Sequence, residues 1–337
     1  MRIVIYGAGA IGASVGGWLA EAGHTVTFLA RPENAKALNE EGLCLHLAGQ
    51  KAALRRIPIR AVSDLGEAGA TEVLVLAVKN YDLDATAREI KAKMDREPIV
   101  VALQNGLENQ SILPRYFARV VYGVVCFNAW RDAPNVVGYQ DKGPIMLGVL
   151  DDALVADRDR LVRAFARAFE CRAEPRLTDA VKCKMLINLA NSVTALVGLG
   201  VRPIEDFAAM RKCIAHVLYE GMQVLQRAGV REVPLANAPN WRVIKASVGL
   251  PAFVADRIFA RNLKKVRMSS MGQDVYMLKR GATELESLNG YFVRLADSVG
   301  FDARYNRRLY AITREWLAQP DIRPMHEAEL WARLDQA

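Results

Sequence analysis

Short hydrophobic runs alternate with segments of helical periodicity in the first half of the chain. Strands are predicted at residues 2–6, 25–29, 73–78 and 99–103, with further β-like runs at 120–125, 136–139 and 145–149. Helices are predicted between them, at residues 10–22 and 83–94. Such alternation is typical of a doubly wound α/β fold built on a parallel sheet.

The pattern changes after Pro175. From Thr178 onward, long stretches of helical periodicity follow one another with almost no convincing strand. Glu174-Pro175-Arg176 separates the two patterns, and 337 residues are enough for two domains that each bury a core. We therefore predict an α/β domain over residues 1–177 and an all-α domain over residues 178–337.

A glycine-rich turn follows the first predicted strand and precedes the first predicted helix. Its sequence, Gly7-Ala8-Gly9-Ala10-Ile11-Gly12, has the GxGxxG spacing. The first glycine permits a tight turn, the second lets the backbone approach a pyrophosphate, and the third allows close packing of helix and strand. The helix N-terminus then offers N–H groups and a positive dipole to phosphate. The turn therefore indicates dinucleotide binding rather than a purely structural role.

The end of the second predicted strand bears on the choice of dinucleotide. Sites that prefer NAD usually carry an acidic residue there, which holds the ribose 2′-hydroxyl. Here the strand ends in Phe28-Leu29 and continues into Ala30-Arg31, without an acidic residue. An arginine can pair with a 2′-phosphate and stack on the adenine, so NADPH is favoured over NADH. The alternative is a solvated arginine at the start of a loop.

A polar stripe crosses the hydrophobic segment 184–197. Lys184, Asn188 and Asn191 stand at positions i, i+4 and i+7 and therefore share one helical face. Burying such groups without partners is costly, so they need hydrogen-bond partners or a ligand. A lysine that faces a cleft can act as a general acid. The pattern alone leaves two interpretations open: a ligand-binding face, or a snorkelling lysine beside two hydrogen-bonded core amides.

Composition and charge exclude several other classes of protein. The chain is 52% hydrophobic and 24% charged, which is ordinary for a globular protein. No hydrophobic run approaches the roughly 18–20 residues that a membrane span needs. Five dispersed cysteines without a CxxC motif favour reduced thiols in the cytoplasm, and four histidines offer little for a metal site. The net charge of +8 is spread along the chain, as small anionic ligands would explain, and does not require nucleic acid.

Five separated motifs cover nearly the whole chain and together resemble those of the ketopantoate reductase (2-dehydropantoate 2-reductase) family. They occur in the family's order and are far more specific in combination than the glycine turn alone. They are Gly7–Gly12 with Leu29-Ala30-Arg31, Ala77-Val78-Lys79, Gln104-Asn105-Gly106, Lys184-x-x-x-Asn188, and Ser269-Ser270-Met271-x-Gln273-Asp274 followed by Thr283-Glu284 and Leu288-Asn289-Gly290.

The resemblance implies both a fold and a reaction. The fold is a Rossmann domain followed by an all-helical domain of the 6-phosphogluconate-dehydrogenase-like type. The reaction is the NADPH-dependent reduction of a 2-oxo acid to a 2-hydroxy acid, with 2-dehydropantoate in pantothenate biosynthesis as the leading substrate. The expected partner is thus a small 2-oxo acid, with neither nucleic acid nor a membrane, in the cytoplasm. Assembly as a homodimer is left open.

The same resemblance implies roles for individual side chains. Lys184 would protonate the substrate oxygen, Glu284 would orient Lys184, and Asn105 would position the lysine and the nicotinamide. The substrate would be bound by Asn188, Asn191, Ser270 and Arg267. The cofactor would be bound by Gly7, Gly9, Ala10, Ile11, Gly12, Arg31, Lys79 and Asn105.

Structural alternatives stay open for these residues. Lys79 can be a surface lysine, and Glu284 can be one carboxylate on a solvated helix. Asn105-Gly106 can be a simple turn, because asparagine and glycine both favour turns. Ser269-Ser270 can cap a helix, with Gln273 at capping-box spacing from Ser270.

The sequence departs from the family pattern on the substrate side. It has extra length around residues 249–266, and the spacing from Asp274 to Glu284 is longer than usual. Arg267 stands where the family commonly has an asparagine that touches the substrate. A guanidinium suits a carboxylate or phosphate, so a substrate with a second anionic group, or a larger substrate, is a hypothesis.

Other functions compete with this interpretation. One is a paralogue that reduces a different 2-oxo acid, or a β-hydroxyacid, glycerol-3-phosphate or opine dehydrogenase of the same architecture. Another is a non-catalytic NADPH-binding regulator, since Rossmann folds also serve in that way. A sensor needs no proton donor, so Lys184 and Glu284 argue against it. Nucleic-acid binding is the weakest alternative, because the sequence has no basic platform rich in aromatic residues.

Overall fold

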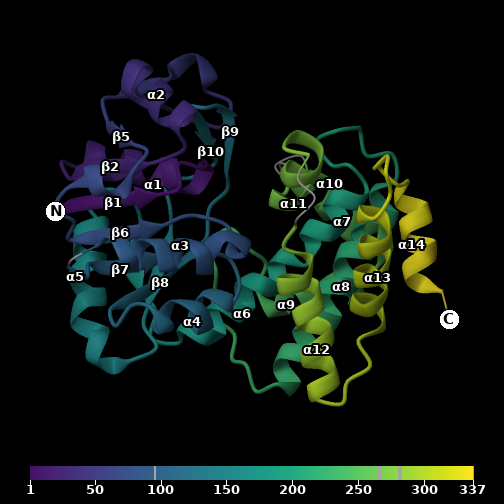
Figure 1. The fold of residues 1–337 in the computed structure, drawn as a ribbon. Coiled ribbons are helices and arrows are strands. Elements are labelled where there is room, and N and C mark those ends of the chain that lie inside the picture. The colour runs from purple at the N-terminus through teal and green to yellow at the C-terminus, as the bar shows by residue number, and fades with distance from the viewer. Residues whose placement is uncertain (95, 264–267, 280–282, 337) are drawn as a thin grey trace. The chain divides into compact units, whose positions relative to one another are not determined.

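The chain divides into two compact units, Met1–Val181 and Lys182–Ala337. A computed structural model, drawn in Figure 1, describes residues 1–94, 96–263, 268–279 and 283–336. The division predicted after residue 177 falls at the start of helix α6 (Leu177–Asn188), whereas the division observed lies within that helix. The tripeptide 174–176 therefore precedes a helix that both units share.

An eight-stranded sheet forms the centre of the first unit, in the order β12-β11-β8-β7-β6-β1-β2-β5. All neighbouring strands are parallel except β8 and β11, which confirms the doubly wound α/β fold. The strand order reverses between β1 and β6, and sheets of this kind bind ligands at such a switch point. The strands are β1 (Arg2–Tyr6), β2 (Thr25–Leu29), β5 (Arg60–Val62), β6 (Val73–Leu76), β7 (Ile99–Ala102), β8 (Val120–Val125), β11 (Ile145–Gly148) and β12 (Cys171–Ala173).

Helices connect these strands, as the alternating pattern predicts. The α-helices of this unit are α1 (Ala10–Glu21), α2 (Pro32–Glu41), α3 (Asn80–Lys93), α4 (Glu108–Ile112) and α5 (Val155–Phe165). Short 3₁₀ turns lie at η1 (Lys51–Ala53), η2 (Leu65–Ala68), η3 (Leu113–Arg115) and η4 (Asp152–Leu154).

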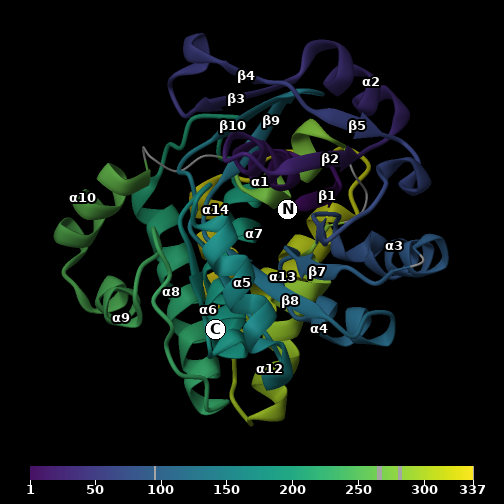
Figure 2. The ribbon, with the colours of Figure 1, turned by 90° about the vertical axis from the view of Figure 1, so that its left-hand side faces the viewer.

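A second sheet of four strands, in the order β4-β3-β10-β9, is absent from the sequence prediction. Figure 2 shows its strands alongside α1. Only one of the four strands, β10, was predicted from its β-like run. Strands β4 and β9 carry charged residues that interrupt any hydrophobic run, whereas β3 has the sequence LCLHL and was missed despite its hydrophobic residues. The strands are β3 (Leu43–Leu47), β4 (Arg55–Ile57), β9 (Ala129–Ala133) and β10 (Val136–Tyr139).

Helix α1 packs against both sheets and uses a glycine on each side. A Cβ atom on Gly16 would lie 2.4 Å from Cζ of Phe28 in β2. A Cβ atom on Gly17 would lie 2.8 Å from side-chain carbons of Leu43 and Leu45 in β3. Glycine disfavours a helix interior by about 1 kcal/mol relative to alanine. The close approach of backbone to side chains on both sides offsets this cost.

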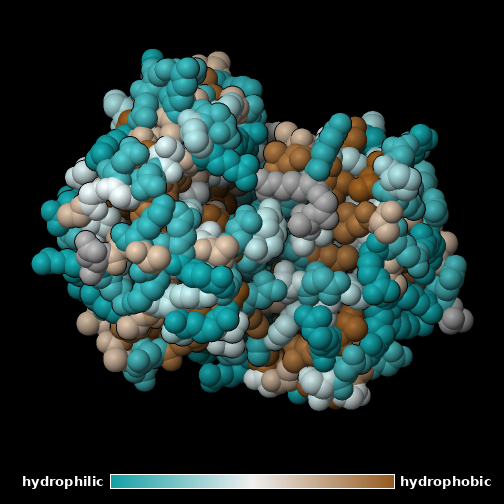
Figure 3. Space-filling model, viewed as in Figure 1, coloured by the Kyte–Doolittle hydropathy of each residue, from teal (hydrophilic) through white to brown (hydrophobic). Residues whose placement is uncertain are grey.

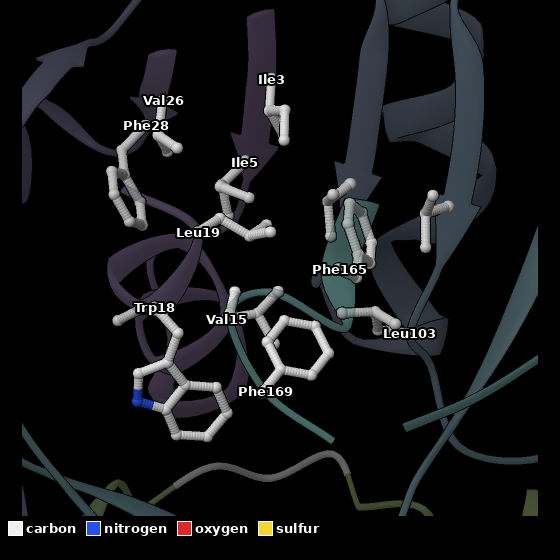
Figure 4. Packing of buried hydrophobic residues seen from close by; sticks show 14 of the residues in the cluster. Ile3, Ile5, Val15, Trp18, Leu19, Val26, Phe28, Leu103, Phe165 and Phe169 are labelled. Carbon is white, nitrogen blue, oxygen red and sulfur yellow. The ribbon is translucent and has the colours of Figure 1, made fainter. Parts of the chain in front are cut away.

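Large hydrophobic side chains fill the space around α1, as Figure 4 shows for Ile3, Ile5, Val15 and Leu19. Trp18 is fully buried at the centre of this core. Its ring centroid lies 5.0 Å from that of Phe127, 5.2 Å from Tyr139 and 5.7 Å from Phe169. Trp18 therefore joins α1 to strand β10 of the second sheet and to the segments that follow β8 and α5.

The second unit is helical, and its described residues form no strand beyond an isolated bridge between Leu199 and Arg202. This confirms the all-α prediction for the described part of this unit. The α-helices after α6 are α7 (Ala190–Leu196), α8 (Phe207–Arg227), α9 (Trp241–Gly249), α10 (Ala252–Leu263), α11 (Ser270–Gly272), α12 (Tyr291–Ser298), α13 (Arg304–Leu317) and α14 (Glu327–Asp335). Two π-helical turns lie at η5 (Gln273–Met277) and η6 (Glu286–Gly290).

Helix α8 is the centre of this unit and contacts α7, α9, α10, α12, α13 and α14. Its buried carboxylate, Glu220, accepts hydrogen bonds from the backbone N–H groups of Tyr305 (3.0 Å) and Asn306 (2.7 Å) at the start of α13. Burial raises the pKa of Glu220, and these hydrogen bonds oppose the rise. The carboxylate thus satisfies N–H groups that a helix leaves without intrahelical acceptors.

The substitution Gly16→Ala tests the packing of α1. The added methyl group would have to displace Phe28 or Ile5, so we expect a loss of about 1–3 kcal/mol in the free energy of unfolding. Urea denaturation measures this loss. Gly249→Ala is the matched control, because a Cβ atom there meets nothing within 4 Å. Equal stabilities of the two variants would contradict the packing argument.

Candidate functional site

The glycine turn between β1 and α1 is sterically restricted at its first and last positions. Gly7 has φ +106°, and a Cβ atom on it would lie 3.0 Å from the backbone C and O of Ala77. A Cβ atom on Gly12 would lie 2.0 Å from the carbonyl oxygen of Gly7. The turn therefore packs directly against the chain that leaves β6, at the switch point of the sheet.

The middle of the same turn is open. A Cβ atom on Gly9 would meet nothing within 4 Å, although Gly9 is the N-cap residue of α1. No side chain caps this end of α1, and its first turn contains no acidic residue. The N–H groups of Ala10 and Ile11 have no intrahelical acceptor, because they lie in the first turn. This space and these donors fit a pyrophosphate.

Arg31 is the residue expected from the sequence to pair with the 2′-phosphate of NADPH. It is the N-cap residue of α2, two residues beyond the end of β2, and its side chain is exposed. The guanidinium makes no hydrogen bond or ion pair with the residues that the structure describes. Its backbone carbonyl accepts hydrogen bonds from the N–H groups of Asn34 and Ala35, each at 2.9 Å. The arginine is thus anchored through its backbone, with its side chain accessible to a ligand.

Lys79 and Asn105 follow the adjacent parallel strands β6 and β7, and both are half-buried. Lys79 is the N-cap residue of α3, and Gly106 adopts φ +86° directly after Asn105. Asn80, which sequence reasoning missed, donates from Nδ2 to the Asn105 carbonyl at 2.5 Å. Gln104 donates from Nε2 to the carbonyl of the last residue of β6 at 2.9 Å. Side-chain amides therefore tie together the turns that end the two strands.

The polar stripe lies along two consecutive helices rather than one. Lys184 and Asn188 belong to α6, and Asn191 belongs to α7. Leu189 between them keeps helical dihedral angles, φ −56° and ψ −32°, so the i, i+4, i+7 spacing is preserved. Asn188 is buried, whereas Lys184 and Asn191 are half-buried.

The structure brings two of the expected substrate residues together. Asn191 donates from Nδ2 to the Ser270 hydroxyl at 3.4 Å. Ser269 donates to the Asn191 carbonyl at 3.3 Å and caps α11 by accepting from the Gly272 N–H at 3.2 Å. The capping serine is therefore Ser269, not Ser270, and Gln273 donates to a backbone carbonyl upstream instead of completing a capping box.

A fully buried hydrogen bond ties α7 to the segment that carries Glu284. Ser192 donates to Oδ1 of Asn289 at 2.8 Å, and neither residue is exposed. Glu284 is itself buried, and its carbonyl accepts from the Leu288 N–H at 3.0 Å. Sequence reasoning quoted Asn289 as part of a motif but missed Ser192, because its partner is 97 residues away.

A third link joins α7 to η5. The Tyr276 hydroxyl donates to the carbonyl of Ala195 at 2.9 Å. Burial raises the pKa of Tyr276 to about 12, so the hydroxyl keeps its proton at neutral pH. Tyr276 therefore serves as a structural contact of α7 and not as a ready proton source.

The region of extra length is described in part. Arg267 lies outside the described residues, so its expected role rests on the sequence alone. The segment before it forms α10, where Phe253 is 76% exposed. Met277, at the end of η5, is 58% exposed. Figure 3 shows hydrophobic residues on the surface of this helical unit.

Two further classes of site were expected to be absent. Across residues 1–94, 96–263, 268–279 and 283–336, no group of three or more His, Cys, Asp or Glu side chains is placed to hold a metal ion. No helix in the described part of the chain has the length and apolar character needed to cross a membrane.

Two family models match the chain. The model "Ketopantoate reductase PanE/ApbA" matches residues 3–152, and "Ketopantoate reductase PanE/ApbA C terminal" matches residues 177–316. A relative from Halobacterium salinarum, named 2-dehydropantoate 2-reductase, is 30% identical over 306 residues, which cover 88% of this chain and 92% of the relative.

Solved structures of similar proteins share the two-domain fold. A PanE/ApbA family ketopantoate reductase from Ralstonia eutropha is 26% identical, with a TM-score of 0.71 over 93% of this chain and 97% of that one. A D-mandelate dehydrogenase solved with NADH and anilino(oxo)acetate has a TM-score of 0.74 over 94% of this chain and 97% of its own, at 19% identity. The second likeness concerns the fold alone.

The substitution Ser192→Ala tests the buried link between α7 and η6. It leaves Oδ1 of Asn289 without its donor, so we expect a loss of about 1–3 kcal/mol in the free energy of unfolding. Thermal and urea denaturation measure the loss. Ser298→Ala is the control, because this exposed serine donates to a carbonyl of its own helix, that of Leu295. If both variants are as stable as the wild type, the link does not hold this segment.

Proposed function

Because this chain belongs to the ketopantoate reductase family, and is an oxidoreductase of that family, we propose that it uses NADPH to reduce a 2-oxo acid to a 2-hydroxy acid. The first candidate substrate is 2-dehydropantoate, and the candidate pathway is pantothenate biosynthesis. The Halobacterium salinarum relative carries that enzyme name and covers most of the chain.

The observation that carries the proposal is the polar stripe on α6 and α7. Lys184, Asn188 and Asn191 keep helical spacing on largely buried helices, and Asn191 reaches the Ser270 hydroxyl. Hydrogen-bond donors grouped in this way suit a small carboxylate with an adjacent oxygen. Binding such a ligand would also offset the cost of placing a cation and two amides in a hydrophobic segment.

The proposed chemistry needs one proton and several fixed dipoles from the protein. Lys184 would deliver a proton to the substrate oxygen as negative charge develops there, which stabilises mainly the transition state. Glu284, buried next to η6, would orient Lys184 and accept a hydrogen bond from the product hydroxyl. Asn188, Asn191 and Ser270 would hold the substrate carboxylate and hydroxyl.

The described residues of the first unit fit a nicotinamide dinucleotide. When bound, this cofactor supplies the hydride. The open space at Gly9, with the N–H groups of Ala10 and Ile11, would hold the pyrophosphate. Arg31 would pair with the 2′-phosphate, and Asn105 and Lys79, at the ends of β7 and β6, would face the nicotinamide half.

A substrate panel tests the proposed activity and its main alternative. NADPH oxidation is followed with 2-dehydropantoate, aromatic 2-oxo acids and dicarboxylic 2-oxo acids. Turnover of 2-dehydropantoate above the others supports the first candidate, whereas a preference for another 2-oxo acid identifies a paralogue. Binding of NADPH without turnover of any 2-oxo acid would favour a regulator and overturn the proposal.

The substitution Lys184→Ala tests the proton donor. We expect kcat to fall by about 100-fold or more while NADPH affinity stays nearly unchanged, because general acid catalysis typically contributes this much. Steady-state kinetics and cofactor fluorescence titration measure the two effects. Lys182→Ala, on a different face of the same helix, is the control and should keep its kcat. A normal kcat in Lys184→Ala would refute the assignment.

The substitution Arg31→Ala tests the choice of cofactor. We expect NADPH binding to weaken by about 1–3 kcal/mol and NADH binding to change little, since only the former carries the 2′-phosphate. Dissociation constants for both cofactors measure this difference. Lys36→Ala removes another exposed cation from the same helix and should leave the preference intact. Equal losses for both cofactors in Arg31→Ala would show that Arg31 does not read the phosphate.

A further inference from the structure

Asn80 links the turns that carry two candidate site residues. It is the first residue of α3, directly after Lys79, and is only 7% exposed. Its Nδ2 lies 2.5 Å from the carbonyl oxygen of Asn105, which is 25 positions further along the chain. A carbonyl oxygen can only accept a hydrogen bond, so the amide nitrogen, and not the oxygen, must face it.

The turn at Asn105 is open around this contact. Gly106 has φ +86°, a conformation that few residues other than glycine adopt, and a Cβ atom there would meet only Nδ2 of Asn80, at 3.7 Å. Few packing contacts restrain this turn, whereas a short hydrogen bond fixes both the distance and the direction between donor and acceptor. The described contact of Asn80 with this turn is thus a hydrogen bond to its backbone.

The other end of the Asn80 side chain is also unusual. Its Oδ1 is buried and has no hydrogen-bond partner among the described residues. A buried acceptor without a partner costs free energy, so asparagine would be a poor choice here for packing alone. The donated hydrogen bond to Asn105 is the described interaction that accounts for an amide at this position.

We propose that Asn80 is a positioning residue, which holds the backbone of Asn105 so that the Asn105 side chain is oriented for the nicotinamide and the reacting groups. This inference rests on the proposed reductase function. Asn80 itself need not touch substrate or cofactor. Its effect would pass through the carbonyl of Asn105, whose displacement by even a fraction of an ångström would misalign the reactants.

Two substitutions at position 80 separate positioning from simple stability. Asn80→Ala removes the side-chain amide, and Asn80→Asp keeps its shape but replaces the donor by an acceptor that repels the Asn105 carbonyl. Asn39→Ala is the matched control, because Asn39 also donates from Nδ2 to a backbone carbonyl, that of Ala61, at 2.8 Å in the same unit. Thermal unfolding, NADPH titration, steady-state kinetics and hydrogen exchange of residues 103–107 are measured for all three.

We expect both Asn80 variants to lower kcat by about tenfold or more and to speed hydrogen exchange at residues 103–107. Asn39→Ala should lose stability to a similar extent but keep its kcat and its exchange rate in this segment. Asn80 variants with a wild-type kcat and unchanged exchange would overturn the proposal. If the wild type reduces no 2-oxo acid, the proposed function fails, and the exchange measurement still decides whether Asn80 holds the turn.

Discussion

The close approach of helix α1 to two sheets is the constraint on which the first unit depends. Gly12 faces the turn and the end of β6, Gly16 faces β2, and Gly17 faces β3. Each glycine weakens the helix by itself, yet any side chain would push α1 away from a neighbour. The same close packing fixes the N-terminus of α1 at the switch point of the main sheet. The position of the N–H groups that we propose for the pyrophosphate is thus a direct consequence of how the helix packs.

In the second unit, polar groups lie inside a helical core and are held there by hydrogen bonds between distant segments. The hydrogen bonds of helix α7 include links from Asn191 to Ser270, from Ser192 to Asn289, and from Ala195 to Tyr276. Residues of one helix therefore connect to segments that lie about 80 to 100 positions away in the chain. The link from Ser192 satisfies buried groups on both sides, and the link from Asn191 joins two of the proposed substrate residues. The two π-helical turns lie in those distant segments, as such turns often do near functional sites.

Much of the main sheet was predictable from the sequence because hydrophobic runs and helical periodicity report local burial. The strands at residues 25–29 and 99–103 and the helix at residues 10–22 agree with β2, β7 and α1 to within one residue at each end. The edge strands of the second sheet could not be predicted because they carry Arg55 and Asp132. The partners of these charged residues are Glu21 in α1 and His46 in β3, which lie far away in the sequence, so local periodicity does not reveal them. The division between α6 and α7 at Leu189 could not be predicted either. The dihedral angles of Leu189 stay helical, so the helical periodicity of the sequence continues across it.

The sequence by itself determined that the chain has a dinucleotide-type glycine turn, a mostly parallel sheet and a helical second half with one polar face. These features depend on spacing along the chain, which side-chain size and backbone periodicity impose locally. Only the tertiary structure decided that Ser269 caps α11, that Ser270 receives the amide of Asn191, and that Asn80 holds the carbonyl of Asn105. Those contacts join residues distant in sequence, and their partners are chosen by how helices and strands pack, which no local pattern encodes.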